Sequence, residues 1–325
     1  MAKLIEEFRV GIVGFGLMGR NHARVVLDLP NTKLVAIVDP VFRDGTYLGV
    51  PVRATVDDVL TEKLDYCVVA TPTRDHLEVA VHLAENNIPC LIEKPLAMDT
   101  AQGKQIADAF QSRMVPAAVG HIERYNPAIR ALRDRIESGE LGDVFMMHTR
   151  RLSPLPERIG DVGVTLDLGT HDFDISRHVL NTEYRDVHAV VQSKSGRTHE
   201  DSISVLARME DETVVSHVIN WLSPIKERSV AVTGERGMLI ADTVLADLTR
   251  YANGVRGEPW NELAQFGGVT EGDVTRFALA KIEPLRAEHI DFQAFVRGEP
   301  NGVCTLEDAN LTLSVAQHVL HARAG

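Results

Sequence analysis

The feature that most constrains the fold is a glycine-rich segment, GFGLMG, which directly follows an apolar run near the start of the chain. Gly14 permits a tight turn, Gly16 lets the backbone approach a pyrophosphate, and Gly19 lets a helix pack against the preceding strand. A second apolar run ends in Asp39, about 20 residues beyond Gly19, where an acid binds a ribose hydroxyl. The combination predicts a dinucleotide site, although the glycines would also suit turn and packing positions beside a solvated Asp39.

Short apolar runs alternate with longer amphipathic runs over the first third of the chain. Runs such as AIV and CVVA lack the alternation of half-exposed strands, and the segments between them have a helical period. This pattern predicts an α/β fold with a doubly wound parallel sheet, and we expect residues 1–120 to form a Rossmann domain.

The pattern changes after about residue 120. Helices are predicted at 127–137 and 163–180, followed by successive alternating strands, with hairpin connections at 210–212 and 234–237. Residues 121–325 therefore predict an α+β domain with a large, mostly antiparallel open sheet. The Gly-rich segment 252–275 is expected to be a loop or an oligomer contact. Two closing helices are expected at 284–297 and 306–322, and a closing helix can pack back on the first domain.

Composition excludes several functions. The formal net charge of −12 opposes sequence-independent binding to nucleic acid or to an anionic membrane. Cys67, Cys90 and Cys304 have no metal-binding spacing, and two of them lie in apolar runs, so buried reduced thiols are expected. Without a signal peptide or a membrane-spanning run in the sequence, a cytoplasmic location follows as an expectation.

The residues near the glycine segment also predict which dinucleotide binds. The carboxylate of Asp39 would repel the 2′-phosphate of NADP, so NAD is favoured, with Arg43 as the one opposing cation nearby. The segment ATPTRDH follows another apolar strand and ends it at Pro72, where a nicotinamide would lie. The residues expected to line the cofactor are Gly14, Phe15, Gly16, Leu17, Met18, Gly19, Asp39, Thr71, Pro72, His76, Glu93 and Lys94.

The segment LIEKPLA ends a further apolar run with Glu93, Lys94 and a proline. Doubly wound sheets bind their ligands at the carboxyl ends of the strands. An ammonium group there could bind a substrate oxygen and stabilise negative charge as hydride leaves the carbon. The alternative is an ordinary surface lysine at a strand end.

The segment DLGTHDFDISRH supplies a second set of polar residues. On one helix Asp167, His171, Asp174 and His178 form a single polar stripe. An exposed helix face with Asp/His pairs would show the same stripe. A metal site is disfavoured, because ligands spread along one helix span too far for a single ion.

These segments, with RYNPAI and EPLRAEHIDF, resemble the Gfo/Idh/MocA family of oxidoreductases in order and spacing over nearly the whole chain. The resemblance implies a Rossmann domain and an α/β domain whose open sheet builds dimers or tetramers. It also implies catalysis by Lys94, Asp167 and His171. A sugar hydroxyl would lose its proton to His171 or Lys94, and its hydride would go to NAD.

The substrate is expected to be a sugar or a nucleotide sugar. The segments around residues 120–128 and 150–174 look most like the branch of the family that oxidises the 3-hydroxyl of UDP-N-acetylglucosamine. Substrate contacts are expected at Lys94, Arg124, Tyr125, Asn126, Arg151, Arg158, Asp167 and His171, with Arg150 as a further cation for a diphosphate. These arginines could instead pair with the excess carboxylates.

Three other functions stay open at the level of sequence. They are an inositol or simple hexose dehydrogenase, a noncatalytic NAD-binding sensor or regulator partner, and a hydrolase or lyase that regenerates NAD in place.

Overall fold

The computed structural model describes residues 7–42, 45–156, 162–254 and 271–322. The chain forms two compact units. The first unit contains residues 1–125 and 283–317, and the second contains residues 126–282 and 318–325. The carboxyl-terminal part of the chain therefore returns to complete the first unit.

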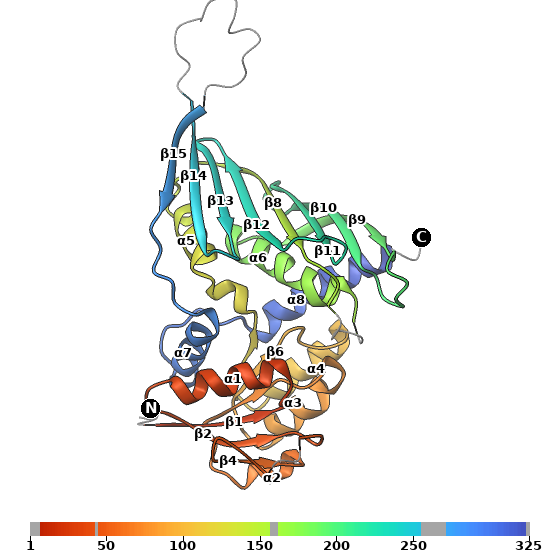
Figure 1. Cartoon of the computed structure of the whole chain (residues 1–325), viewed down its shortest axis with the longest axis vertical. Coiled ribbons are helices and arrows are strands. Elements are labelled where there is room, and N and C mark those ends of the chain that lie inside the picture. The colour runs from red at the N-terminus through yellow and green to blue at the C-terminus, as the bar shows by residue number, and fades with distance from the viewer. Residues whose placement is uncertain (1–6, 43–44, 157–161, 255–270, 323–325) are drawn as a thin grey trace, which may run out of the picture. The chain divides into compact units, whose positions relative to one another are not determined.

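The first unit is built on a seven-stranded sheet with the order β3-β4-β2-β1-β5-β6-β7 (Figure 1). All its pairings are parallel except the one between β3 and β4. The strands are β1 Phe8–Val13, β2 Thr32–Val38, β3 Thr46–Tyr47, β4 Val50–Arg53, β5 Tyr66–Val69, β6 Cys90–Glu93 and β7 Ala117–Gly120. The predicted doubly wound sheet is confirmed, and its strand order reverses beside β1, the position where such sheets bind ligands.

The helices of the first unit are α1 Leu17–Asp28, α2 Val56–Leu60, α3 His76–Glu85, α4 Thr100–Gln111, α7 Pro284–Arg297 and most of α8 Leu306–His321, with short 3-10 helices at Thr73–Asp75 and Ile122–Tyr125. Helix α1 lies beside α7, and α3 lies beside α4 (Figure 1). The apolar core joins Val10 and Ile12 of β1 to Ala23 of α1 and Phe292 of α7. Burial of these side chains explains why a helix from the end of the chain completes an amino-terminal domain.

The second unit is built on an eight-stranded sheet with the order β15-β14-β13-β12-β8-β11-β10-β9. Its pairings are antiparallel except for the parallel pair of β8 and β11. The strands are β8 Val144–Leu152, β9 Tyr184–Gln192, β10 Ser202–Met209, β11 Val214–Asn220, β12 Glu227–Gly234, β13 Gly237–Asp242, β14 Asp247–Asn253 and β15 Glu271–Phe277. The predicted mostly antiparallel sheet is confirmed.

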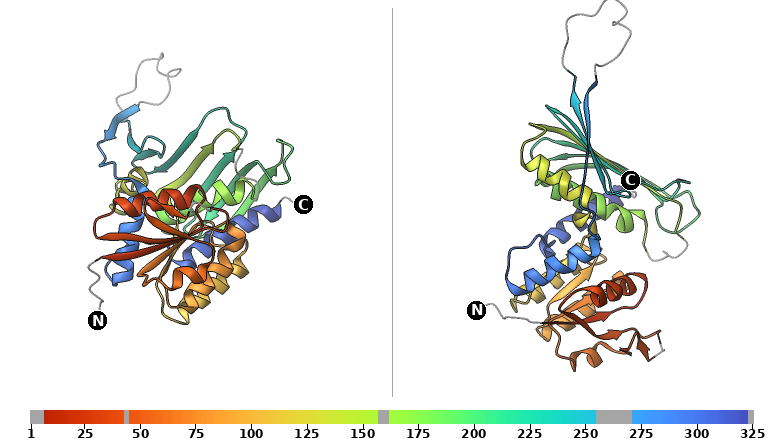
Figure 2. Two further views of the ribbon diagram at one scale, coloured as in Figure 1. Left: turned by 60° about the horizontal axis from the view of Figure 1, so that its bottom comes forward. Right: turned by 60° about the vertical axis from the view of Figure 1, so that its left-hand side comes forward.

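Helices α5 Pro127–Glu137 and α6 Thr170–Leu180 cover one face of this sheet (Figure 2). Leu132 of α5 and Ile175 of α6 pack against strand residues such as Met147 and Val232. Along β10, buried and exposed side chains alternate, which is the pattern of a sheet with one face packed and one face open.

Most predicted elements are confirmed at their expected positions. Helices α5 and α7 have the predicted bounds, and tight connections join β10 to β11 and β12 to β13. All three cysteines are buried thiols, as expected. Within the described residues, no helix combines the length and the apolar character needed to cross a membrane.

The expectation for residues 252–275 is a loop or an oligomer contact. A loop is wrong at both ends, because β14 extends to Asn253 and residues 271–277 form β15 on β14, whereas the oligomer contact stays a prediction. Gly272, which suggested a loop, is required by the sheet itself. A Cβ atom at Gly272 would lie 2.5 Å from the backbone oxygen of Ala252. Residues 255–270 lie outside the described residues.

Candidate cofactor and catalytic site

Four expected site segments meet at the carboxyl edge of the parallel sheet. The last residue of β1, Val13, is in register with Val38 of β2 and Val69 of β5, and Val69 is in register with Ile92 of β6. The residues that follow these positions include Gly14, Asp39, Thr71 and Lys94. The sheet therefore gathers them at one edge, as the alternation of strands and helices predicted.

The glycine segment has the geometry that its three glycines predicted. Gly14 has a φ of +94°, and a Cβ atom there would lie 2.4 Å from the oxygen of Ala70. At Gly19 a Cβ atom would lie 1.9 Å from the oxygen of Gly14. At Gly16, by contrast, it would meet no described atom within 4 Å. The two outer glycines thus serve close packing, and the middle one leaves open space for a ligand.

Helix α1 begins at this open position. Gly16 is its N-cap and supplies no side-chain cap, and the first turn contains no acidic residue. Its first amide groups are therefore available for an anion, and the helix dipole favours one. Leu17 is exposed and Met18 is half-buried, whereas the ring of Phe15 packs edge-on against Phe42. These residues fit a dinucleotide whose pyrophosphate lies over Gly16.

The Asp39 carboxylate, at the end of β2, accepts a hydrogen bond from the glycine segment. Its Oδ2 accepts a hydrogen bond from the Phe15 amide at 2.8 Å, and its Oδ1 accepts from the Val41 and Phe42 amides at 2.8 and 3.0 Å. Partial burial raises the pKa of Asp39. The backbone hydrogen bonds and the charge of Arg20 lower it by a larger amount, so the pKa lies below its usual value. A carboxylate has about four acceptor positions, and three are used here, which leaves one for a ribose hydroxyl.

Arg20 is a residue of this site that the sequence analysis missed. Its guanidinium lies 5.1 Å from the ring centre of Phe15 and 5.6 Å from that of Phe42. It is the described cation that lowers the pKa of Asp39, whereas Arg43, the cation considered from the sequence, lies outside the described residues. The sequence did contain a signal for this role, because Arg20 directly follows Gly19 and lies one helical turn from Gly16.

The segment after β5 is tied to the segment after β6 by His76. Its Nε2 lies 3.1 Å from the Thr71 oxygen, and its Nδ1 lies 3.1 Å from the Pro95 oxygen and 3.3 Å from the Leu96 oxygen. Burial lowers the pKa of His76 despite these carbonyl partners. The imidazole therefore holds two edge segments together, and its contact with a cofactor stays a prediction, as do those of Thr71 and Pro72.

Lys94 follows the last residue of β6 and is half-buried. Its amide donates to Oε2 of Glu93 at 3.2 Å, and Oε1 of Glu93 lies 2.8 Å from Nε2 of His22. Burial raises the pKa of Glu93, but His22 and the Lys94 charge lower it more, so the net pKa lies below its usual value. The buried Glu93 carboxylate therefore contacts the backbone amide of Lys94, the predicted catalytic residue.

The predicted Asp167 and His171 lie in the second unit. Residues Thr165–Gly169 form a π-helical turn rather than the start of a regular α-helix, and α6 continues from it. His171 is 9 % exposed and Asp174 is 1 % exposed, so the alternative of an exposed Asp/His face is wrong. π-helical turns occur frequently at functional sites. Because Lys94 belongs to the first unit, its joint action with Asp167 and His171 stays a prediction.

The cations expected at the substrate have partners within their own units. Arg124 is buried and pairs with Asp308 at 3.4 Å. Arg151 is 2 % exposed and forms a buried ion pair with Asp172 at 2.8 Å, whereas the exposed Arg150 pairs with Glu227 at 3.3 Å. Removing one partner of a buried pair such as Arg151–Asp172 is destabilising, because the other charge stays buried without compensation. Arg158 lies outside the described residues.

Tyr125 and Asn126 mark the junction between the two units. Burial and the nearby Glu288 raise the pKa of Tyr125, which therefore stays protonated. The Asn126 side chain caps α5 by accepting from the Ala128 amide at 3.0 Å, and it donates to the Thr243 oxygen at 2.9 Å. Both polar ends of Asn126 are thus used by the fold, and substrate contact by these residues stays a prediction.

Comparison with known families identifies both halves of this arrangement. Residues 8–121 match the oxidoreductase family model for the NAD-binding Rossmann fold, Gfo/Idh/MocA. Residues 129–240 match the Gfo/Idh/MocA C-terminal domain. The chain belongs to the Gfo/Idh/MocA family. Its first unit is accordingly an NAD-binding Rossmann domain, which agrees with the glycine geometry and with Asp39.

Relatives of this Gfo/Idh/MocA protein include dehydrogenases named for UDP-N-acetylglucosamine and for scyllo-inositol. The chain is 28 % identical over 187 residues to the rhizopine catabolism protein MocA of Rhizobium meliloti, covering 55 % of this chain and 59 % of that one. It is 32 % identical over 188 residues to UDP-N-acetylglucosamine 3-dehydrogenase of Acidithiobacillus ferrooxidans, covering 57 % and 58 %. These matches therefore span less than two thirds of either relative.

A solved structure extends the likeness to nearly the whole chain. The UDP-N-acetylglucosamine 3-dehydrogenase of Acidithiobacillus ferrooxidans superposes with a TM-score of 0.84 at 25 % identity, over 97 % of both chains. Both units of this Gfo/Idh/MocA protein thus have counterparts in that dehydrogenase.

Proposed function

We propose that this protein is an NAD-dependent dehydrogenase that oxidises a secondary hydroxyl of a sugar to a ketone. The proposed substrate is the 3-hydroxyl of UDP-N-acetylglucosamine or of a related nucleotide sugar. The observation that carries the proposal is the position of Lys94 at the same sheet edge as the glycine segment and Asp39. The likeness over 97 % of the chain to a UDP-N-acetylglucosamine 3-dehydrogenase supports the choice of substrate.

Bound NAD supplies the acceptor for the hydride. The ammonium group of Lys94 donates a hydrogen bond to the reacting hydroxyl oxygen and stabilises the negative charge that develops there. With Lys94 as an ammonium group, His171 takes the hydroxyl proton; in the alternative, Lys94 is a neutral amine and takes the proton itself. Asp167 orients the base. In this proposal the substrate contacts are Tyr125, Asn126 and the arginines at 124, 151 and 158.

The proposed chemistry is tested by single substitutions. We expect Lys94→Ala and His171→Ala to lower kcat by about 10²-fold or more, because general acid-base catalysis typically contributes about 10²- to 10⁴-fold. The dissociation constant for NAD, measured by quenching of protein fluorescence, should stay close to the wild-type value. Near-normal turnover in both variants would remove these residues from the mechanism.

The substrate is tested by a screen with NAD. UDP-sugars, free hexoses and inositols are offered at equal concentration, NADH formation is followed by absorbance, and the keto product is identified by mass spectrometry and NMR. The expected result is the fastest turnover with UDP-N-acetylglucosamine. Faster turnover with inositol or a free hexose would mean that this compound, and not a nucleotide sugar, is the substrate. Tight binding of NAD without net formation of NADH would favour a sensor or an enzyme that retains its cofactor.

We also propose that the open face of the eight-stranded sheet packs against a second copy of the chain. The apolar side chains on this face that are between 38 and 63 % exposed include Val190, Leu206, Val214 and Val218. These four lie on the neighbouring strands β9, β10 and β11. Apolar groups gathered on one face typically mark an interaction surface.

A further inference from the structure

A continuous chain of buried polar side chains crosses the first unit and ends next to Lys94. Its members come from three elements besides β6, and each is between 0 and 7 % exposed: His22 of α1, Tyr66 of β5, His289 and Gln293 of α7, and Glu93 of β6. Burying this many polar groups is costly unless each one is hydrogen-bonded. The proposed reaction uses none of these side chains directly, so the chain requires its own explanation.

The links of the chain are short. Oε1 of Glu93 lies 2.8 Å from Nε2 of His22, and Nδ1 of His22 lies 2.9 Å from Nε2 of His289. Nδ1 of His289 lies 3.0 Å from the Tyr66 hydroxyl. The Gln293 amide nitrogen lies 3.4 Å from that hydroxyl. It also lies 3.0 Å from Oγ1 of Thr32.

A single direction of donation along the chain satisfies every link when Glu93 is ionised and each imidazole carries one proton. A carboxylate can only accept, so Nε2 of His22 donates to it and Nδ1 of His22 accepts from His289. The second nitrogen of His289 then accepts from the Tyr66 hydroxyl. Burial, together with the adjacent His22, keeps the pKa of His289 well below its usual value, and burial raises the pKa of Tyr66. In this pattern each group of the chain donates to the next group in the direction of Glu93.

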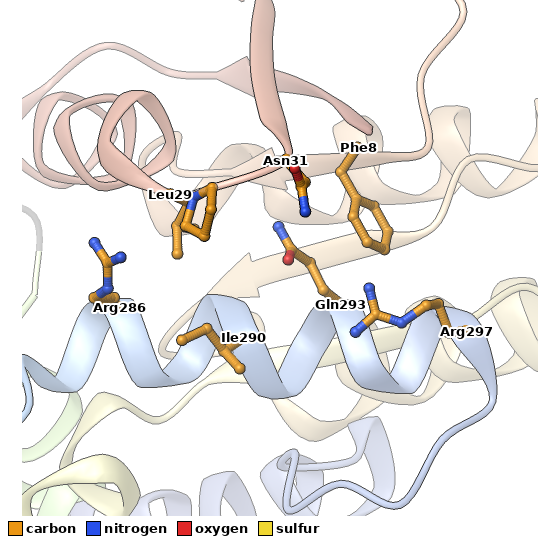
Figure 3. A pocket seen from close by; sticks show the side chains of 8 residues that line it. Phe8, Leu29, Asn31, Arg286, Ile290, Gln293 and Arg297 are labelled. Carbon is orange, nitrogen blue, oxygen red and sulfur yellow. The ribbon is translucent and has the colours of Figure 1, made fainter. Parts of the chain in front are cut away.

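The far end of the chain lies at a surface pocket of about 310 Å³ beside the amino edge of the sheet. Gln293 lines this pocket between Arg286 and Arg297 on one face of α7, with Asn31 opposite (Figure 3). Both arginines have carboxylate partners, Arg286 at Asp28 and Arg297 at Glu299. The pocket is thus the outer end of the chain, and the Glu93 carboxylate is the inner end.

The inner end of the chain, the Glu93 carboxylate, binds the backbone amide of Lys94. One oxygen of Glu93 is held by His22, and the other accepts from the Lys94 amide at 3.2 Å. Besides His22, the groups whose charges act on Glu93 are the Lys94 ammonium and His76 of α3. Burial and the charge of Glu93 raise the pKa of Glu288 of α7 well above its usual value, which favours the neutral form of Glu288. Glu93 is thereby the buried anion that holds Lys94.

We propose that His22 and His289 are positioning residues of the reaction, which hold Lys94 in its reactive geometry through the Glu93 carboxylate. This inference rests on the role of Lys94 in the proposed function. A misplacement of about 1 Å at a reacting group can lower the rate about 10²-fold, so a rigid anchor beneath Lys94 has a direct effect on turnover. Neither histidine touches the reacting atoms in this account.

The test compares two substitutions of His22 with the wild type, using the sugar and NAD found active in the screen. His22→Leu removes both hydrogen bonds, whereas the amide of His22→Gln can donate to Glu93 and accept from His289. We expect His22→Leu to lower kcat by about 10- to 10²-fold with a nearly unchanged dissociation constant for NAD. We expect His22→Gln to recover most of that loss.

The pH profile of kcat separates positioning from a general loss of stability. Without His22 the effect of burial on Glu93 is offset only by Lys94 and His76, so the pKa of Glu93 rises. The acidic limb of the profile should therefore move to higher pH in His22→Leu and return in His22→Gln. A variant that is merely less stable, measured well below its melting temperature, would keep the wild-type profile. His289→Leu, which cuts the chain one link further away, should show the same changes at smaller size and serves if His22→Leu does not fold.

The outcomes distinguish this inference from the function on which it rests. Wild-type kcat and pH profile in His22→Leu and His289→Leu, with Lys94→Ala inactive, would overturn positioning and leave the proposed function intact. Normal turnover in Lys94→Ala would overturn the proposed function itself. A loss in His22→Leu that His22→Gln does not recover would also count against positioning through hydrogen bonds.

Discussion

At the scale of single residues, the Asp39 carboxylate binds backbone amides of the fold and is also the proposed partner of the cofactor's ribose. Three of its acceptor positions bind backbone amides of the glycine segment and of the turn after β2. The remaining position faces the proposed ribose. Its lowered pKa means that it is ionised at neutral pH, so the position beside the ribose carries a full negative charge.

This arrangement predicts the effect of removing the carboxylate. We expect Asp39→Ala or Asp39→Ser to lower the ratio of kcat/KM for NAD to kcat/KM for NADP by about tenfold or more, because a hydrogen bond to a charged group is worth about 1.5–3 kcal/mol. Arg20 would then be free to attract the 2′-phosphate. Steady-state kinetics with both dinucleotides measures the ratio, with Asp57→Ala, an exposed acid on α2, as the control. An unchanged ratio would contradict the role of Asp39.

His217 provides a second prediction at this scale. It is 1 % exposed, and its ring lies 2.8 Å from both the Thr149 and the Tyr184 hydroxyls. Burial, and secondarily the charge of Arg151, lower its pKa from 6.5 to about 3. Between pH 6.5 and about 3 this histidine binds a proton in the unfolded state but not in the folded state. Protonation therefore favours unfolding, and the free energy of unfolding declines as the pH falls through this window.

We expect this histidine to make the free energy of unfolding fall by about 1.4 kcal/mol for each pH unit within that window. Trp221 is buried in the second unit, so its fluorescence during urea denaturation follows that unit. His217→Gln should show a shallower dependence on pH than the wild type. Parallel dependences for the two proteins would contradict the prediction.

At the scale of elements, α5 shows how a local signal placed a helix correctly. Asn126 precedes Pro127, and the structure uses Asn126 as N-cap and Pro127 as the first helical residue. Proline suits this position because its missing amide would have no partner there. The α6 segment shows the opposite case, because nothing in its periodicity predicted the π-helical turn at 165–169.

The N-cap can be tested through stability. We expect Asn126→Ala to lower the free energy of unfolding of the second unit by about 1–2 kcal/mol, because it removes the cap and leaves the Thr243 oxygen without its donor. Asn126→Asp restores the capping oxygen alone and should recover part of the loss. The measurement is urea denaturation followed by tryptophan fluorescence. Equal stabilities of Asn126→Ala and the wild type would show that the cap contributes nothing.

At the scale of the whole molecule, each unit needs a different kind of partner to bury its apolar surface. The parallel sheet is completed by helices, including α7 from the end of the chain, whereas the eight-stranded sheet is covered on one face by α5 and α6. On its other face, exposed apolar side chains alternate with polar ones such as His188 and Arg150. A second copy of the chain is the proposed cover.

We therefore expect Leu206→Asp combined with Val218→Asp to convert an oligomer into a single chain, because the charges would be buried without partners. Light scattering during gel filtration measures the molar mass. Met114→Asp is the matched control, since Met114 is apolar and 91 % exposed but lies in the first unit. A wild-type protein that is already a monomer would contradict the proposal, as would a double variant with unchanged mass.

The sequence alone determined the features that depend on neighbours along the chain. The period of apolar residues distinguishes buried strands from helices, and glycine and proline mark turns and caps, because these preferences act over a few residues. For this reason the Rossmann domain, the hairpins, α5 and α7 could be predicted. The order of Gly14, Gly16, Gly19 and Asp39 was also enough to predict a dinucleotide site.

Tertiary structure alone decided the features that depend on residues far apart in sequence. His22 and His289 are separated by 267 positions, and Gly272 is explained only by the strand beside it. Arg20 belongs to the site only because its guanidinium packs on Phe15 and Phe42 next to Asp39. A hydrogen bond or a close approach between distant segments leaves no period in the chain, because its geometry exists only after the sheet has brought the segments together.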